Sequence, residues 1–227
     1  MLNETILSLI FIVLFISIFL IDMYVTDHRR GKITVKTALL WSGLWITIAL
    51  LFGLLIYFTL PDGKQKGFEF ITGYIIEYSL SVDNLFVFII IFKLMRIKEQ
   101  NQPHILKWGI IGAVVFRILF IVIGVQLIKS FSFMIYVFGI ILVYTAYKMI
   151  TSKDEEIHPD KNIFVRAASR LFTISKSSET HHFFITENGK KVATIAFVTL
   201  LLVESTDIIF AIDSIPAILA ITQDSFI

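Results

Sequence analysis

The sequence predicts an all-α, polytopic integral membrane protein. Of its 227 residues, 56% are hydrophobic and only 17% are charged, and the mean hydropathy is +0.83. Soluble globular chains usually contain about 45–50% apolar and about 25% charged residues. The apolar residues also gather in long runs, and a membrane helix needs about 20 of them in succession. Together these observations exclude a soluble domain.

Six apolar segments are long enough to be membrane spans. The first has no positive residues before it and no A-x-A-like cleavage site after it, so we expect a retained anchor and not a signal peptide. The second ends before Pro61-Asp62-Gly63, a turn signal. The six spans cover about residues 6–24, 38–60, 70–92, 105–128, 131–150 and 192–221.

The placement of Lys and Arg predicts the orientation of these spans. One side of the membrane receives four bases after the first span, four after the third and eight after the fifth; the other side receives three. Positively charged loops stay in the cytoplasm. We therefore expect a multi-pass protein of the cytoplasmic membrane with its N-terminus outside. The net charge of +2 gives no indication of a nucleic-acid partner.

Three regions follow from this pattern. Residues 1–150 form a membrane domain with the first five spans, residues 151–191 form a cytoplasmic loop, and residues 192–227 carry the sixth span. Within the loop, residues 164–172 indicate a short amphipathic helix. The pair Asn188-Gly189 suits the type I′ turn of a β-hairpin.

Seven ionisable residues lie inside or at the edges of the apolar spans. A charge at the centre of a membrane costs about 2.5–3.5 kcal/mol even on the lenient insertion scale. Six acids and one base cannot all neutralise one another, so the remaining acids must be protonated, hydrated or bound to cations. Arg117 is expected to be a structural counter-ion, and Asp22 is as compatible with a structural role as with a functional one. The seven are Asp22, Glu77, Asp83, Arg117, Glu204, Asp207 and Asp213.

The acids of the third and sixth spans share a spacing. Each span contains an acid, five residues, an aspartate and a small polar residue: Glu77-x5-Asp83-Asn84 and Asp207-x5-Asp213-Ser214. The two spans should cross the membrane in opposite directions, which is compatible with a 3+3 inverted repeat. Pro216 is expected to break the sixth helix and free carbonyl groups near Asp213.

This arrangement indicates a cation site built from oxygen atoms. Carboxylate, amide and carbonyl ligands suit Mg²⁺, Ca²⁺ or Mn²⁺, and these residues do not distinguish among the three. The chain has no cysteine, which excludes thiolate metal sites. The predicted ligands are Glu77, Asp83, Asn84, Glu204, Asp207 and Asp213. The secondary candidates for site residues are Ser81, Ser214, Asp22 and Arg117, the last as a counter-ion and not as a ligand.

Two long motifs, 77–88 and 203–217, together with Gly109, Gly112 and Arg117, resemble the TerC/Alx family of bacterial membrane proteins, named for tellurium-ion resistance. The resemblance covers nearly the whole chain and implies a manganese exporter. It places the family's intramembrane acids on the carboxylates named above and implies Mn²⁺ as the transported ion, with no prosthetic group. Family members have further helices after this point, so we expect a C-terminally truncated member.

Two other functions are compatible with the same residues. The protein could be a membrane partner of the secretion machinery that delivers metal to exported metalloproteins. It could also be an intramembrane aspartyl hydrolase with Asp83 and Asp213 as its dyad, although no Gly-x-Gly-Asp motif surrounds either residue. We favour a transporter over an enzyme. The sequence does not indicate an oligomeric state.

Overall fold

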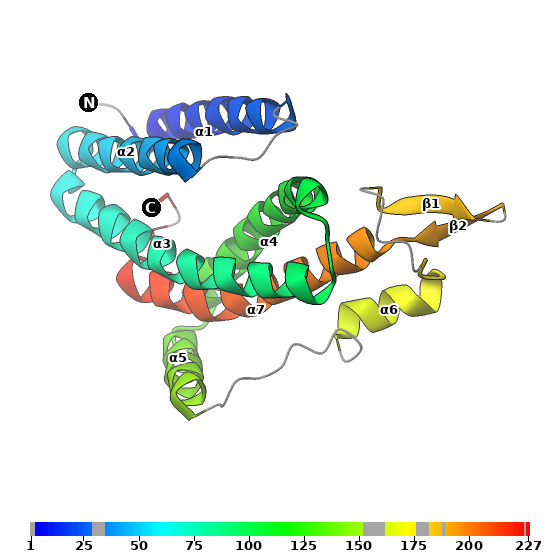
Figure 1. The fold of residues 1–227 in the computed structure, drawn as a ribbon. Coiled ribbons are helices and arrows are strands. Elements are labelled where there is room, and N and C mark those ends of the chain that lie inside the picture. Colours follow the sequence, from blue (N-terminus) through cyan, green and yellow to red (C-terminus); the bar gives the residue numbers. More distant parts are fainter. Residues whose placement is uncertain (1–2, 29–34, 152–161, 176–181, 188, 225) are drawn as a thin grey trace. The chain divides into compact units, whose positions relative to one another are not determined.

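The structure, a computed structural model, describes residues 3–28, 35–151, 162–175, 182–187, 189–224 and 226–227. Helices dominate this part of the chain, as the composition predicts (Figure 1). In order, the elements are α1 (Glu4–His28), α2 (Val35–Thr59), α3 (Gly63–Leu94), the 3₁₀ turn η1 (Glu99–Asn101), α4 (Gln102–Ser130), α5 (Met134–Thr151), α6 (Ile163–Leu171), β1 (Phe184–Glu187), β2 (Lys190–Ala193) and α7 (Ile195–Ile221).

Five of the described helices, α1, α2, α3, α4 and α7, are long and apolar enough to cross a membrane. The predicted fifth span falls on α5, which is shorter. Its 18 residues rise about 27 Å, against a hydrocarbon thickness of about 30 Å. The sixth membrane crossing therefore stays a prediction. The 3+3 inverted repeat also stays a prediction.

Two details of the sixth span differ from the sequence prediction. Val192 and Ala193 belong to β2, so the helix begins at Ile195. The predicted break at Pro216 is wrong, because α7 continues through that residue as one α-helix. Proline has the backbone φ of a helix and removes only one hydrogen bond. Membrane helices tolerate that loss where surrounding groups compensate for it.

The chain divides into two compact units, and the first comprises residues 1–79 and 218–227. Its core consists of Leu7, Phe52, Ile56 and Leu60, against which Phe226 and Ile227 pack. Lys66 in the first turn of α3 forms ion pairs with Glu4 and, at 2.6 Å, with Asp224. The Lys66 side chain therefore connects the beginning of α3 with the beginning of α1 and with the residues after α7.

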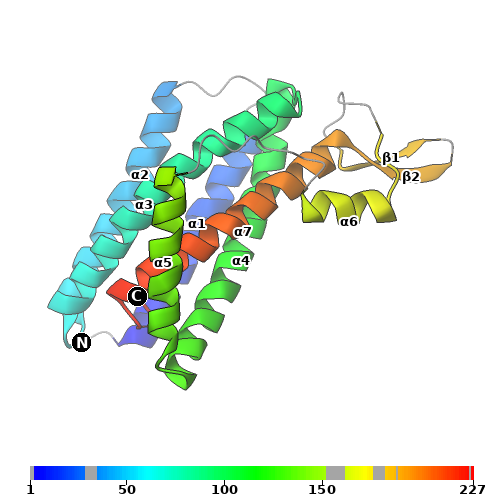
Figure 2. The ribbon, with the colours of Figure 1, turned by 90° about the horizontal axis from the view of Figure 1, so that it is seen from below.

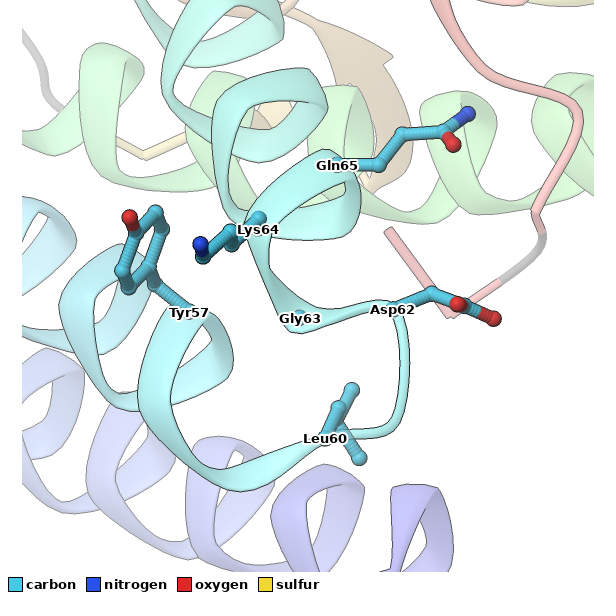
Figure 3. A pocket seen from close by; sticks show the side chains of 6 residues that line it. All are labelled: Tyr57, Leu60, Asp62, Gly63, Lys64 and Gln65. Atoms are coloured by element: carbon cyan, nitrogen blue, oxygen red, sulfur yellow. The ribbon is translucent and has the colours of Figure 1, made fainter.

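A shallow pocket of the first unit lies at the turn between α2 and α3 (Figure 3). Asp62 makes this turn with a φ of 46°, and the side chains of Asp62 and Gln65 extend away from the turn. The residues that line the pocket are Tyr57, Leu60, Asp62, Gly63, Lys64 and Gln65. None of the predicted metal ligands is among them.

The second unit comprises residues 80–217. One apolar cluster joins Phe92, Ile97, Ile105 and Ala196, so the end of α3, the beginning of α4 and the beginning of α7 meet there. The ring of Phe183, just before β1, lies 5.1 Å from the ring of His104 on α4. The residue that precedes the hairpin is therefore packed against the beginning of α4.

The segment between α5 and α7 contains a short helix and a hairpin. Asn162 caps α6, since its Oδ1 accepts hydrogen bonds from the backbone N–H groups of Phe164 and Val165 at 3.0 and 3.2 Å. Strands β1 and β2 pair antiparallel with Glu187 opposite Lys190, and Gly189 in the loop has a φ of 75°. Figures 1 and 2 show α6 beside the N-terminal half of α7.

Candidate functional site

The candidate site lies where α4 packs against α7 inside the second unit. Gly109 of α4 faces Val203, where a Cβ would lie 3.1 Å from the valine Cγ1. Farther along, Arg117 pairs with Asp207. Residue numbers rise together on the two helices, so α4 and α7 run parallel at this contact. The sequence folds this way locally because glycines allow two helices to approach closely.

Glu204 occupies the space that Gly112 leaves open. A Cβ on Gly112 would overlap the carboxylate of Glu204, so only glycine accommodates the side chain in this position. The Oε2 atom of Glu204 is buried and has no hydrogen-bond partner among the residues that the structure describes. A buried carboxylate oxygen without a partner is costly, and a bound cation or a proton would remove that cost.

Asp207 lies one turn farther along α7 and is 5% exposed. Its Oδ1 accepts a hydrogen bond from Nη2 of Arg117 at 3.3 Å. Its Oδ2 is buried, and within the described part of the chain it has no hydrogen-bond partner. Residues three apart on a helix are neighbours on its surface. The half-buried Glu204 and the buried Asp207 thus present two carboxylates at one place, each with one buried oxygen, with one guanidinium beside them.

Ser205 links this pair to the segment between α5 and α7. The serine is 3% exposed, and its Oγ donates a hydrogen bond to the carbonyl of Leu202 at 2.9 Å. The same Oγ accepts a hydrogen bond from Nδ2 of Asn162 at 2.7 Å. The residue that caps α6 therefore also contacts the helix of the two acids, between Glu204 and Asp207.

The other predicted ligands are not all brought to this place. Asn84 on α3 is buried in the second unit and Ser81 is exposed, whereas Glu77 and Asp22 belong to the first unit. Ser214 is buried, and its Oγ has no hydrogen-bond partner among the described residues. The side chains of Asp83 and Asp213 lie outside the description. Among the side chains that are described, no three acids or histidines gather closely enough to hold a metal ion.

The sequence alone did not identify two features of this site. One is the space at Gly112, for which the signal is the pair Gly109 and Gly112 on one side of a helix. The other is the hydrogen bond from Asn162 to Ser205, residues 43 positions apart. No local pattern predicts such a distant contact.

Long apolar helices with buried carboxylates define the class of this protein: it is a multi-pass integral membrane protein. The chain belongs to the TerC family, because the family model described as "Integral membrane protein TerC family" matches residues 62–227. The resemblance seen in the sequence is thereby confirmed. No solved structure matches the chain.

Several curated proteins are similar over most of the chain. An uncharacterized membrane protein of Myxococcus xanthus is 42% identical over 217 residues, which are 96% of this chain and 67% of that protein. The putative membrane-bound redox modulator Alx of Salmonella typhi is 38% identical over 88% of this chain and 64% of its own length. The protein of the same name in Escherichia coli K12 is 37% identical. The chain thus spans about two thirds of the length of these relatives.

Proposed function

We propose that this chain belongs to a transporter that exports a divalent metal ion, with Mn²⁺ as the expected ion, across the bacterial cytoplasmic membrane. The observation that carries the proposal is the pair of buried carboxylate oxygens, Oε2 of Glu204 and Oδ2 of Asp207, on a membrane helix. Carboxylate oxygens are the ligands that hard divalent cations prefer. Ionisable groups inside a membrane commonly mark an ion path.

Arg117 supports the proposal by its charge and not as a ligand. A guanidinium carries donors only and cannot coordinate a cation. Its hydrogen bond to Oδ1 of Asp207 leaves Oδ2 for another partner. With both acids ionised, the three side chains together carry one negative charge. Binding of a divalent cation would change the total charge from −1 to +1. The initial negative charge favours binding, and its small size keeps release of the ion feasible.

The other predicted ligands, three acids and one amide, complete the proposed path. Glu77, Asp83, Asn84 and Asp213 are expected to supply further oxygens as the ion passes, since the sequence places them in the same pattern of spans. Manganese, in preference to magnesium or calcium, rests on the family resemblance. The ion would enter from the cytoplasm and leave outside, where protonation of an acid on release is one route to coupling.

The test measures cellular manganese in a bacterial strain that lacks its own exporters. Expression of the parent should lower the manganese content, whereas Glu204→Gln, Asp207→Asn and Asp213→Asn should each leave it at the level of the empty vector. Asp62→Asn is the matched control, because this exposed acid lies in the turn between α2 and α3. If Asp207→Asn and Glu204→Gln export manganese as well as the parent, the site is wrong.

A second measurement separates export from delivery of metal to exported proteins. Purified protein in sealed vesicles should move Mn²⁺ with no other protein present, and competition with Mg²⁺ and Ca²⁺ reports the selectivity. Because relatives are longer, the experiment uses both this chain and one of these relatives. If neither of them moves Mn²⁺ in vesicles, the transport proposal is overturned.

A further inference from the structure

We propose that the transported ion leaves Glu204 and Asp207 along one buried side of α7, past Ala211, to a second position at the hydroxyl group of Ser214. This inference rests on the proposed function and adds to it the direction of the path and the side chain that limits its width. It depends on the burial and the spacing of Asp207, Ala211 and Ser214, which all belong to the second unit.

The hydroxyl group of Ser214 differs from other hydroxyl groups of α7 in its hydrogen bonding. Serine and threonine in helices commonly donate to a carbonyl of the preceding turn, and Thr199 and Thr206 do so, each at 2.8 Å. Ser214 is 3% exposed, and its Oγ has no hydrogen-bond partner among the described residues. A buried polar group that no other group satisfies is costly. This cost indicates that the hydroxyl group interacts with water or with an ion.

Ser214 lies on the same side of α7 as Asp207. Seven residues are close to two turns of an α-helix, so the two residues share a side and lie about 10 Å apart along the axis. Arg117 of α4 pairs with Asp207 on this side. The Oδ2 of Asp207, like the Oγ of Ser214, is buried without a partner in the described part of the chain. One buried side of α7 therefore carries two oxygen atoms, two turns apart, that no described residue satisfies.

Ala211 lies between these two oxygen atoms. It follows Asp207 by four residues and precedes Ser214 by three, which places it on the same side of the helix. It is 1% exposed, and its methyl group is the only small side chain in the run Ile-Ile-Phe-Ala-Ile of residues 208–212. The opposite side of the helix is different, since Ile209 is 58% exposed. A longer side chain at residue 211 would therefore occupy the space that an ion needs between the two positions.

The chemistry of the two positions favours movement of the ion from Asp207 toward Ser214. The loop charges predict that α7 begins on the cytoplasmic side, so Ser214 lies nearer to the outside than Asp207. A serine oxygen can coordinate a hard cation but carries no charge, so it binds the ion less strongly than the carboxylates of Glu204 and Asp207. An ion path needs sites that are strong enough for entry and weak enough for release. The hydroxyl group of Ser214 provides the weaker site on the side of release.

The test uses the absence of cysteine from the sequence, so that a single introduced thiol is the only one present. Ser214→Cys and the matched control Ile209→Cys are reconstituted in sealed vesicles and compared with the parent. A small, charged methanethiosulfonate reagent should modify residue 214, which lines the aqueous path, and should not modify residue 209. Because thiolates prefer soft cations, Cd²⁺ should inhibit Mn²⁺ transport by Ser214→Cys at concentrations about tenfold or more below those that inhibit the parent or Ile209→Cys.

Substitution of Ala211 tests the width of the path. Ala211→Leu should reduce Mn²⁺ transport to the level of empty vesicles, whereas its affinity for Mn²⁺, measured by calorimetric titration, should be retained because Glu204 and Asp207 are unchanged. Ala211→Ser, which adds one oxygen atom, should keep transport. Ala220→Leu is the matched control, because this alanine of α7 is exposed.

The outcomes separate this path from the transport function. If the parent moves no Mn²⁺, the transport function is wrong and the path is wrong with it. If the parent moves Mn²⁺ but residue 214 is not modified, or if Cd²⁺ inhibits Ser214→Cys no more than Ile209→Cys, the path is wrong while transport stands. Transport by Ala211→Leu at the rate of the parent would also overturn the path, and Ala211 would then serve only the packing of α7.

Discussion

Gly112 determines where the carboxylate of Glu204 can lie. The Glu204 side chain occupies the volume that a Cβ on residue 112 would need. Glycine at position 112 is therefore needed to place this carboxylate, and not to form α4. Because the end of a glutamate side chain is flexible, an added methyl group would displace the carboxylate without unfolding α4. The position therefore offers a way to change the geometry of the site while the fold is kept.

We expect Gly112→Ala to weaken Mn²⁺ binding by about tenfold or more, since displacement of a ligand typically costs that much affinity. Calorimetric titration with Mn²⁺ measures the affinity, and cellular manganese reports export. Gly139→Ala on α5 is the control, because nothing lies within 4 Å of a Cβ there. Shortening the acid in the double variant Gly112→Ala, Glu204→Asp should restore part of the affinity. Unchanged affinity in Gly112→Ala would remove Glu204 from the ligands.

At the scale of elements, the side chain of Asn162 makes two interactions: it caps α6 and forms a hydrogen bond with α7. Oδ1 of Asn162 caps α6, and Nδ2 of the same residue donates to Ser205. Loss of a cap costs a helix about 1 kcal/mol. For a helix of nine residues, too short to be stable alone, that loss is large. The attachment of α6 therefore depends strongly on residue 162.

We expect Asn162→Ala to increase hydrogen exchange in residues 163–171 by about fivefold or more, because both the cap and the contact with α7 are lost. Ser205→Ala removes only the contact, so it should raise exchange less. Exchange in α4 should not change in either variant and serves as the internal control. Equal protection of α6 in the parent and in Asn162→Ala would mean that apolar packing of Val165 and Ala168 is sufficient.

The helices could be predicted from the sequence because a membrane imposes a length and a composition on each of them. The hairpin at 184–193 could be predicted because Asn-Gly has a specific turn preference. The contact of Glu204 with Gly112 could not, since it depends on which sides of two distant helices meet. The continuity of α7 at Pro216 depends on packing along that helix, which a local rule about proline does not include.

At the scale of the whole molecule, the direction of α4 and α7 bears on the number of membrane crossings. The two helices run parallel, and both begin at one apolar cluster that includes Ile105 and Ala196. A chain that leaves this cluster along α4 must cross back before α7 begins. Among the described elements between them, only α5 has the length and apolar composition to do so, and unpaired backbone is not tolerated in lipid.

We therefore expect α5 to cross the membrane, which places η1 and the β-hairpin on one side. Since α3 is also long enough to cross, we expect the turn before it to lie on the other side. Single cysteines at Glu99, Thr186 and Gln65, all exposed, test this with a membrane-impermeant thiol reagent in intact cells and in inverted vesicles. Glu99→Cys and Thr186→Cys should react only in inverted vesicles, and Gln65→Cys only in intact cells. If Thr186→Cys reacts in intact cells while Glu99→Cys reacts only in inverted vesicles, then α5 does not cross. If both react in intact cells, α5 crosses and the orientation derived from the charge of the loops is wrong.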